Sequence, residues 1–429
     1  MASPQALPEL ASLAALNGAL RSGRLKARAL VRAAAERLKE EARPGGALRE
    51  LLEDEAMRAA RDVERELGRG RTRGLLQGAP FGVSEMMAVA GRRPAWDAEA
   101  ADARGVEDSA PVARLRAAKA LLLAVTASPP LGGVAEGLLA SETAAASVVA
   151  RGLLPFALAV DFNGNVIRAA LAQGCCALRP TFGTVSGYGV APLGWTLATA
   201  AVLARSAEDC GIVLDQLSGG DSRSPHSPGR AFRYAPQYAR APAQLRVTLV
   251  QADEALKASL ATLGVEMADF SGPGLPAQAV LDIILAAEAG EAFAHELETT
   301  PGGREYLSEA AGLRAFDYLR AMRLRRQIQA WLAEAAGRAD VLVVPWNPAR
   351  ASQNRMAAEA DAASPECTVL AAAILAGAPV FASRTASGGA WFALARPQAE
   401  NTLLRFASAL EAKSAGGGEF ASSGSSPVA

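Results

Sequence analysis

Few residues of this chain have the side chains that most often carry catalysis. Its 429 residues include only two histidines, His226 and His295, too few for a histidine-built zinc site or a series of histidine acid–base steps. The four cysteines form no CxxC pair, so their spacing predicts neither a disulfide framework nor a zinc ribbon. We therefore expect no metal and no cofactor, which leaves serines, lysines and carboxylates as the groups that could react.

Cys175 and Cys176 are tempting nucleophiles because two thiols are adjacent. They lie in an apolar stretch with no histidine or lysine nearby to lower the pKa of a thiol, and we interpret both as packing residues. His295, in an amphipathic segment with glutamates close by, is predicted to be a surface or structural residue. His226 lies in a Ser- and Pro-rich loop.

The segments that must position any site alternate between helical and strand-like patterns. Residues 9–70 place apolar side chains at helical spacing and predict two or three helices with solvated charged faces. Between 74 and 217, short apolar runs bounded by Gly or Pro alternate with helical stretches, which is typical of an α/β sheet covered on both faces. Further strands and helices follow a Gly-, Ser- and Pro-rich loop at 218–245.

Overall charge narrows the range of partners. The 44 basic and 44 acidic side chains balance, whereas a protein that coats nucleic acid or an anionic membrane needs a basic excess. No window approaches the roughly 20 apolar residues of a membrane span, and the first residues lack a signal-peptide pattern. The composition, rich in Ala, Gly and Arg, predicts a cytoplasmic, bacterial-type globular protein with no nucleic-acid and no membrane partner.

Several segments occur in an order that one protein family shares. QGAPFGVSEMMAVAG follows the form hGvPxxvKDxxxvaG, and DSAPVARLRAAKALLLAVT follows D(A/S)xxVxxLRxAGAxxxGKT. PFALAVDFNGNVIRAALAQGCCALRPTFGTVSGYGVAPL follows xxxGTDxGGSIRxPAxxxGxxGLKPTxGxVxxxGxxPL, and LARSAEDCGIVLDQLSGGD, ADVLVVPWNP and LAGAPV match later motifs. In this order they resemble the amidase signature family, which comprises amide hydrolases and the amidase-like subunits of amidotransferases. The resemblance is almost continuous over 10–221 and patchy over 246–412.

The resemblance implies a specific catalytic apparatus, which this chain does not keep intact. The family uses a serine nucleophile, a second serine in a cis peptide and a lysine base, with backbone N–H groups of a glycine turn for the oxyanion. Ser84 stands at the lysine position, and Asn165 stands at the nucleophile position. Ser141, at the family's separation from Asn165, is the only match to the catalytic triad that remains.

No shift of register restores the missing groups. The chain has no lysine between Lys39 and Lys119 and no serine between Ser147 and Ser186. Loss of a serine nucleophile costs on the order of a millionfold in turnover in a serine protease. The stretch 126–141 is also shorter than in the family, which removes part of the usual pocket wall.

The implied oxyanion turn and Ser141 each have two interpretations. The implied oxyanion turn falls on Asp161, Phe162, Asn163 and Gly164. Asn163 replaces a glycine but accepts positive φ better than most residues, so we expect the tight turn to persist, either as a residual anion site or as a structural turn. Ser141 is also placed as an ordinary N-cap of the helix that follows, which is the interpretation we favour.

Two further features concern the pocket. Ala198 and Trp346 stand where the family has polar residues, which suggests a filled pocket. Glu85, Glu142 and Asp161 would form a carboxylate pair only if the family fold brings them together.

The sequence therefore predicts one large α/β domain of the amidase-signature type, with a mixed central sheet covered by helices on both faces. We expect an N-terminal helical arm at 1–70 and the core at 71–412, with the loop 218–245 inside it. A disordered tail at 413–429, native or a cloning remnant, lies outside the fold.

The main functional hypothesis is a pseudoenzyme, an amidase homologue that has lost amide hydrolysis. It would bind a small amide or carboxylate ligand, or a protein partner, as a subunit of a complex or a homodimer. The alternative is an active but diverged hydrolase of small amide- or carboxyl-containing compounds. A purely structural dimer subunit is a third interpretation.

Overall fold

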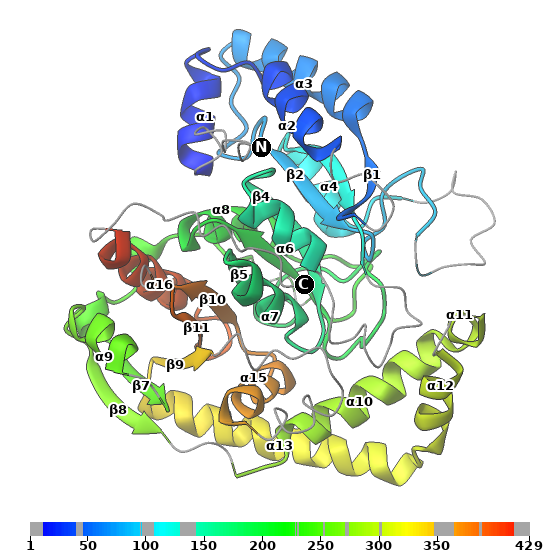
Figure 1. Cartoon of the computed structure of the whole chain (residues 1–429), viewed down its shortest axis with the longest axis vertical. Helices are drawn as coiled ribbons and strands as arrows, with labels where there is room; N and C mark the ends of the chain where they lie inside the picture. Colours follow the sequence, from blue (N-terminus) through cyan, green and yellow to red (C-terminus); the bar gives the residue numbers. More distant parts are fainter. Residues whose placement is uncertain are drawn as a thin grey trace, which may run out of the picture.

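Short apolar segments of the sequence form the strands of one long sheet (Figure 1). The computed structural model describes residues 12–39, 46–94, 96, 107–128, 143–227, 229, 231–251, 254–270, 274–299, 303–346, 364–385 and 388–415. Within these residues, eleven strands pair in the order β1-β3-β2-β4-β6-β5-β10-β11-β9-β7-β8. The strands are β1 Leu48–Leu51, β2 Pro80–Ser84, β3 Leu121–Thr126, β4 Phe156–Asp161, β5 Cys176–Arg179, β6 Thr199–Ala204, β7 Arg246–Val250, β8 Glu266–Phe270, β9 Val341–Trp346, β10 Val380–Arg384 and β11 Ala390–Leu394.

The sheet is mixed, which confirms the predicted fold class. β3, β2 and β4 are parallel neighbours, as are β9, β7 and β8, and the other pairs are antiparallel. Strands β3 and β4 are buried at every residue, as expected for strands with helices on both faces. Because β2 and β4 run parallel, the residues that follow them lie at the same edge of the sheet.

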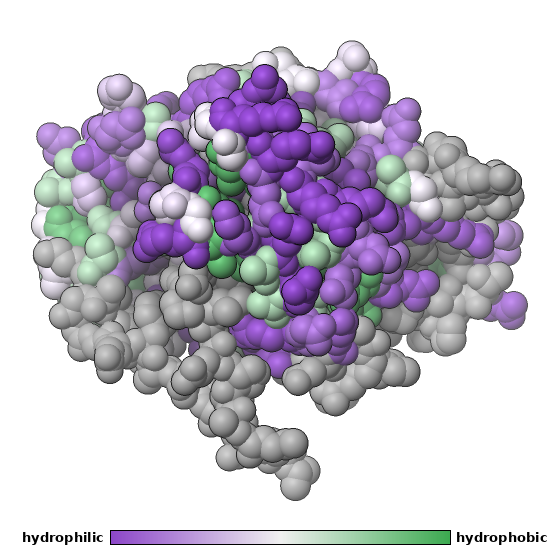
Figure 2. Space-filling model, turned by 90° about the horizontal axis from the view of Figure 1, so that it is seen from above, coloured by the Kyte–Doolittle hydropathy of each residue, from purple (hydrophilic) through white to green (hydrophobic). Residues whose placement is uncertain are grey.

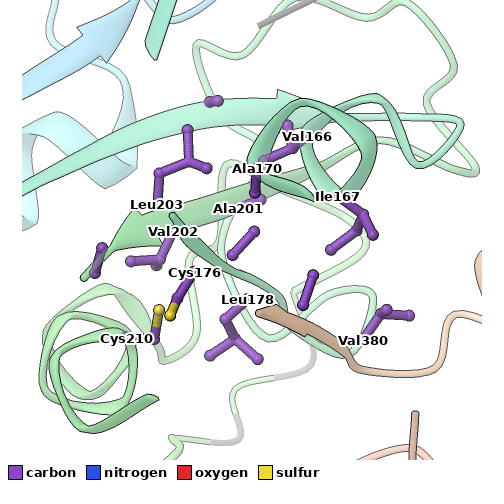
Figure 3. Close-up of a cluster of buried hydrophobic side chains, with 14 of the residues drawn as sticks. Val166, Ile167, Ala170, Cys176, Leu178, Ala201, Val202, Leu203, Cys210 and Val380 are labelled. Carbon is purple, nitrogen blue, oxygen red and sulfur yellow. The ribbon is translucent and has the colours of Figure 1, made fainter. Parts of the chain in front are cut away.

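Helices cover both faces of this sheet. Figure 3 shows Val166, Ile167 and Ala170 of α7 on one side of β5 and β6, and Cys210 of α8 on the other side. The helices are α1 Leu13–Arg21, α2 Ala27–Lys39, α3 Glu53–Gly68, α4 Ala110–Ala117, α6 Thr143–Ala150, α7 Asn165–Gln173, α8 Ala207–Leu217, α9 Glu254–Ala261, α10 Ala277–Ala292, α11 Ala294–Thr299, α12 Gly303–Gly312, α13 Ala315–Arg338, α15 Pro365–Leu375 and α16 Glu400–Ala415, with short 3₁₀ turns η4 Pro236–Tyr238 and η5 Pro242–Gln244 in the predicted loop.

The N-terminal region differs from the sequence prediction at one element. Between α2 and α3, where only helices were expected, β1 pairs antiparallel with β3 at the edge of the sheet. A four-residue strand is too short to show a clear period, so its pairing partner decides its conformation. At the other end, α16 extends to Ala415 and includes the first residues of the predicted tail.

The charged faces of the N-terminal helices are solvated, as predicted. α3 buries Ala56, Ala60 and Val63 on one side. The face of the molecule seen in Figure 2, on the side of α1–α3, is largely hydrophilic. Among the described helices, none is both long and apolar enough to cross a membrane.

Candidate functional site

Two of the three positions implied by the catalytic motif lie at one edge of the sheet. Ser84 is the last residue of β2, and Asn165 follows the end of the parallel neighbour β4 by four residues. Ser141 and Glu142 lie outside the described residues, so their roles stay predictions.

Side chains of the turn between β4 and α7 accept several of its backbone N–H groups. Oδ1 of Asp161 accepts the N–H of Gly164 at 3.0 Å, and Oδ2 accepts the N–H of Val166 at 3.1 Å. Oδ1 of Asn163 accepts the N–H of Asn165 at 3.1 Å. An N–H already bonded to a buried side chain stabilises an oxyanion only after that bond breaks, which removes the preorganisation that catalysis needs.

Asn165 ties this turn to the strand before it. Its Oδ1 accepts the N–H of Phe162 at 3.1 Å, and its Nδ2 donates to the carbonyl of Val160 at 2.9 Å. The residue is buried, with 1% of its surface exposed. Since an amide is not among the side chains that form covalent intermediates, the structure gives Asn165 a structural role.

Gly164, rather than Asn163, adopts the left-handed conformation of the turn. The φ of Gly164 is +84°, whereas Asn163 is not among the residues with positive φ. The turn is tight, and its left-handed residue is Gly164 and not the residue that replaces a family glycine. Glycine meets this need without the steric cost of a Cβ.

Apolar side chains of α15 cover the turn beside Gly164. A Cβ added to Gly164 would lie 2.7 Å from Cδ2 of Leu370 and 3.2 Å from Cδ1 of Ile374. Both side chains are fully buried. This side of the turn is therefore filled by protein.

A fully buried ion pair anchors the turn from the adjacent part of the sheet. Nη1 of Arg179 lies 2.7 Å from Oδ1 of Asp161 and also donates to the Asp161 carbonyl at 2.8 Å. Nη2 of Arg179 donates to the carbonyl of Leu197 at 2.6 Å. Burial lowers the pKa of the Arg179 guanidinium, and the charge of Asp161 opposes that shift. Asp161 is thus committed to structure.

Ser84 is paired with a serine that sequence reasoning missed. Its buried Oγ lies 2.9 Å from Oγ of Ser128 and accepts the N–H of Met86 at 3.2 Å. Ser84 is in register with Thr126 of the parallel strand β3, so the residues just beyond Thr126 approach it. A sequence-based prediction that β2 and β3 pair in parallel, with Ser84 beside Thr126, could have pointed to Ser128.

Glu85 is held beside this serine pair. Its Oε1 accepts the N–H of Ser128 at 2.6 Å, and its Oε2 lies 3.5 Å from Nε of Arg49. Burial raises the pKa of the Glu85 carboxyl, while the Ser128 N–H and the charge of Arg49 oppose the shift. Glu85 and Asp161 each bond to separate donors, so their described contacts do not include the carboxylate pair considered from the sequence.

Two pocket replacements are packed against apolar neighbours. Trp346 is buried, and its ring meets that of Phe392 edge-on at a centroid distance of 6.1 Å. Ala198 is partly buried against the core.

The cysteines and histidines lie where the sequence suggested. All four cysteines are free and buried, and burial raises the pKa of Cys175 to about 12 and raises that of Cys176. A raised pKa leaves the thiols of Cys175 and Cys176 poor nucleophiles. His226 and His295 are exposed. Among the described residues, no group of three or more His, Cys, Asp or Glu side chains could hold a metal ion.

Known proteins similar to this chain are amidases and amidase-like subunits. The family model described as Amidase matches residues 143–268. An amidase of Pseudomonas putida is 27% identical over 344 residues, which cover 71% of this chain and 72% of that protein. This chain is an amidase homologue by sequence similarity. Another relative, a glutamyl-tRNA(Gln) amidotransferase subunit of Roseiflexus castenholzii, is 27% identical over 337 residues, 64% of this chain and 68% of the relative.

Solved amidase structures share the fold. The peptide amidase of Stenotrophomonas maltophilia superposes with a TM-score of 0.77 at 22% identity, covering 94% of this chain and 97% of that chain. A chain from a vestigial protein complex, described as revealing the origins of an s-triazine catabolic enzyme, superposes with a TM-score of 0.78 at 22% identity. It covers 92% of this amidase homologue and 97% of its own length.

Proposed function

We propose that this amidase homologue does not hydrolyse amides and acts instead by binding a small amide or carboxylate compound or a partner protein. One observation carries the proposal. The N–H groups of Phe162, Gly164, Asn165 and Val166 are bonded to side chains of the turn itself, and Leu370 covers Gly164. A family oxyanion turn has no reason to be filled in this way if it must receive a tetrahedral intermediate.

The positions of the nucleophile and the base support the same proposal. Asn165 supplies no attacking oxygen or sulfur and is fixed by two hydrogen bonds to the backbone of β4 and the turn. Ser84, at the lysine position, is fully buried and bonded to Ser128. A serine hydroxyl cannot take a proton near neutral pH as a neutral lysine can.

A second candidate function, an active but diverged hydrolase, has one specific observation in its favour. Ser84 and Ser128 form a hydroxyl pair at 2.9 Å, next to Glu85, whose pKa is raised by burial. A carboxyl with a raised pKa is a usual general base, and Ser128 is only half-buried. In this alternative Ser128 would be the nucleophile.

Turnover of a panel of aryl and short-chain amides separates the two. The pseudoenzyme proposal predicts equal, background-level rates for the wild type, Ser141→Ala and Ser128→Ala. A wild-type rate that Ser141→Ala abolishes would overturn the proposal, and a rate that Ser128→Ala abolishes would establish the diverged hydrolase.

Thermal unfolding in the presence of amides and carboxylates tests the binding role. A ligand that binds only the folded state raises Tm, and at 100 times its Kd it adds about 2.7 kcal/mol. Stabilisation by an amide or carboxylate would support small-molecule binding. The absence of any shift, together with a stable homodimer, would favour the purely structural subunit.

Restoring the family residues tests whether the site has decayed from an active one. The double variant Asn165→Ser with Ser84→Lys returns the nucleophile and the base to their family positions. Amidase activity in this variant would support a decayed ancestral site. A folded but inactive double variant would direct attention to Leu370 and to the short 126–141 stretch.

The cellular role we propose is that of a cytoplasmic protein that works with a partner. One relative is named as a subunit of an amidotransferase, and one similar structure is described as a protein complex. The free, buried cysteines suit a reducing compartment. Co-purification under native conditions tests this role, with a constant second protein as the expected result and a lone chain as the contrary one.

A further inference from the structure

Helix α13 carries the most exposed pair of large apolar side chains on any one described helix. Phe316 is 76% exposed and Leu319 is 54% exposed. Next to them is a surface groove of about 440 Å³, lined by Leu319, Met322, Arg323, Arg325, Arg326 and Gln329. Exposed apolar residues gathered beside a groove mark sites of interaction more often than single exposed residues do.

The same stretch of helix is strongly cationic. Between Asp317 and Glu334 the helix contains four arginines and no acidic residue. Arg325 is buried and donates to the carbonyls of Leu375 and Thr196. Arg323 and Arg326 are exposed, and neither forms an ion pair with another residue that the structure describes.

The position of α13 on the molecule is fixed by polar contacts on its inner side. Tyr318 donates to Oε1 of Glu288 on α10 at 3.3 Å, and Nη1 of Arg325 lies 2.9 Å from Oγ1 of Thr196. In Figure 1 α13 runs beside α10 along one end of the molecule. The exposed side is therefore presented on a firmly held helix, which suits recognition because little order is lost on binding.

Spacing and charge define what fits this surface. Phe316, Leu319, Arg323 and Arg326 follow one another at intervals of three or four residues, so they lie along one side of the helix over about 15 Å. A ligand complementary to this side of α13 has a row of apolar residues about three helical turns long, with carboxylates next to that row. An amphipathic acidic helix has that pattern.

Two other occupants suit the surface less well. Pairing of α13 with its own copy would bring Arg323 and Arg326 against like charges, which is unfavourable. Attraction to an anionic membrane is favoured by a cluster of basic residues on a cationic protein, whereas this chain has equal numbers of basic and acidic side chains.

We propose that the outer face of α13, formed by Phe316, Leu319, Met322, Arg323 and Arg326, docks an acidic amphipathic helix of a partner protein. The inference gives a location and a chemistry to the partner-binding role and rests on that part of the proposed function. The apolar residues supply the buried contact, and the two arginines pair with carboxylates and set the orientation.

The test uses the full chain and a fluorescent synthetic peptide of about four helical turns, with leucines on one face and glutamates beside them. A second peptide has lysines in place of the glutamates. Fluorescence anisotropy is expected to give a Kd at least about tenfold lower for the acidic peptide, with the preference falling as salt rises. Equal binding of the two peptides would overturn the proposal.

Variants assign the binding to α13. Arg323→Glu with Arg326→Glu is expected to weaken acidic-peptide binding at least about tenfold and to favour the lysine peptide, while Phe316→Ala with Leu319→Ala weakens binding of the acidic peptide about fivefold or more. Tyr238→Ala and Arg58→Glu with Arg61→Glu are matched exposed controls, expected to stay within about twofold. Equal losses in the controls would overturn the proposal.

Three further outcomes separate the alternatives. Dimerisation of the wild type that Phe316→Ala with Leu319→Ala abolishes would assign the face to a second copy and overturn the proposal. Binding to phosphatidylserine vesicles without binding to the acidic peptide would do the same. Acidic-peptide binding in a chain that also hydrolyses amides would support the docking surface while contradicting only the pseudoenzyme part of the proposed function.

Discussion

The β4–α7 turn and the outer face of α13 use their polar groups in opposite ways. In the turn, the side chains of Asp161, Asn163 and Asn165 accept the nearby backbone N–H groups, and the apolar Leu370 covers Gly164. On α13, Arg323, Phe316 and Leu319 are exposed to solvent. The turn is complete in itself, whereas the helix face has capacity for a partner.

This difference concerns how buried and exposed polar groups are satisfied. A buried polar group must be satisfied, and in the turn this is done by internal hydrogen bonds. A surface arginine has water as an alternative partner, and leaving it unpaired costs little. The hydrogen-bonded groups of the turn leave few donors for a ligand, whereas the exposed arginines of α13 can still pair with one.

The contact between α1 and α8 lies between these extremes. Oδ1 of Asp209 accepts the N–H of Leu13 at 2.9 Å, while its buried Oδ2 has no hydrogen-bond partner among the described residues. Burial raises the pKa of Asp209 to about 6, with a smaller effect from Glu208 in the same direction. Oδ1 is therefore hydrogen-bonded, whereas the buried Oδ2 lacks a partner in the described part of the chain and makes the charged form of the carboxyl costly.

The largest effect is expected from the buried ion pair of the turn. Asp161→Asn leaves the Arg179 charge buried without a counter-charge and should lower the free energy of unfolding by about 3–5 kcal/mol in urea denaturation. The control is Asp62→Asn, in an exposed pair with Arg65, with an expected loss below about 1 kcal/mol. If Asp161→Asn lost no more stability than this control, the turn would not depend on the Asp161–Arg179 pair.

The next effect compares one substitution in both regions. Leu370→Ala leaves a cavity beside Gly164 and should lower the free energy of unfolding by about 2–4 kcal/mol. Leu319→Ala removes the same atoms from the exposed face of α13 and should change the free energy of unfolding by no more than about 0.5 kcal/mol. Similar losses at the two sites would contradict the contrast between a filled turn and an open face.

Asp209 should give a pH-dependent difference. Its folded-state pKa, about 6, exceeds the unfolded value near 3.9, so between these values the folded state binds more protons and the unfolding free energy falls as pH rises. Asp209→Asn removes this dependence. Between about pH 4 and pH 7.5, the free energy of unfolding of Asp209→Asn should rise by about 2–3 kcal/mol relative to that of the wild type. This follows from a pKa difference of about two units at about 1.36 kcal/mol per unit.

Urea unfolding of both proteins at the two pH values measures that gain. Asp317→Asn is a suitable control because Asp317 is partly exposed and its pKa is lowered by Arg314, so its contribution has the opposite sign. The same wild-type-to-Asn difference at both pH values would show that Asp209 does not titrate in this window.

The smallest effect is expected on α13 itself. Phe316→Ala with Leu319→Ala should leave the free energy of unfolding within about 1 kcal/mol of wild type, because both side chains are largely exposed. Differential scanning calorimetry checks this expectation. A large loss of Tm would mean that these residues support the fold and are not reserved for a partner.

Much of the fold and part of the site could be predicted from the sequence. Strands such as β3 and β4 are continuous apolar runs bounded by Gly or Pro, and α13 has a long helical pattern, so local signals suffice for them. The replacements at Ser84 and Asn165 could be predicted from the motifs because residue types at motif positions need no coordinates. β1 was missed because four residues show no clear period.

The sequence by itself determined the family resemblance and the mixed α/β class, and it predicted that the family's lysine and serine are missing from their positions. Only the tertiary structure decided that the turn is filled, that Gly164 and not Asn163 is left-handed, and that Ser128 meets Ser84. The physical reason is separation along the chain. Leu370 lies on α15, far in sequence from Gly164, and contacts between distant segments depend on packing of the whole sheet and its helices, which no local pattern specifies.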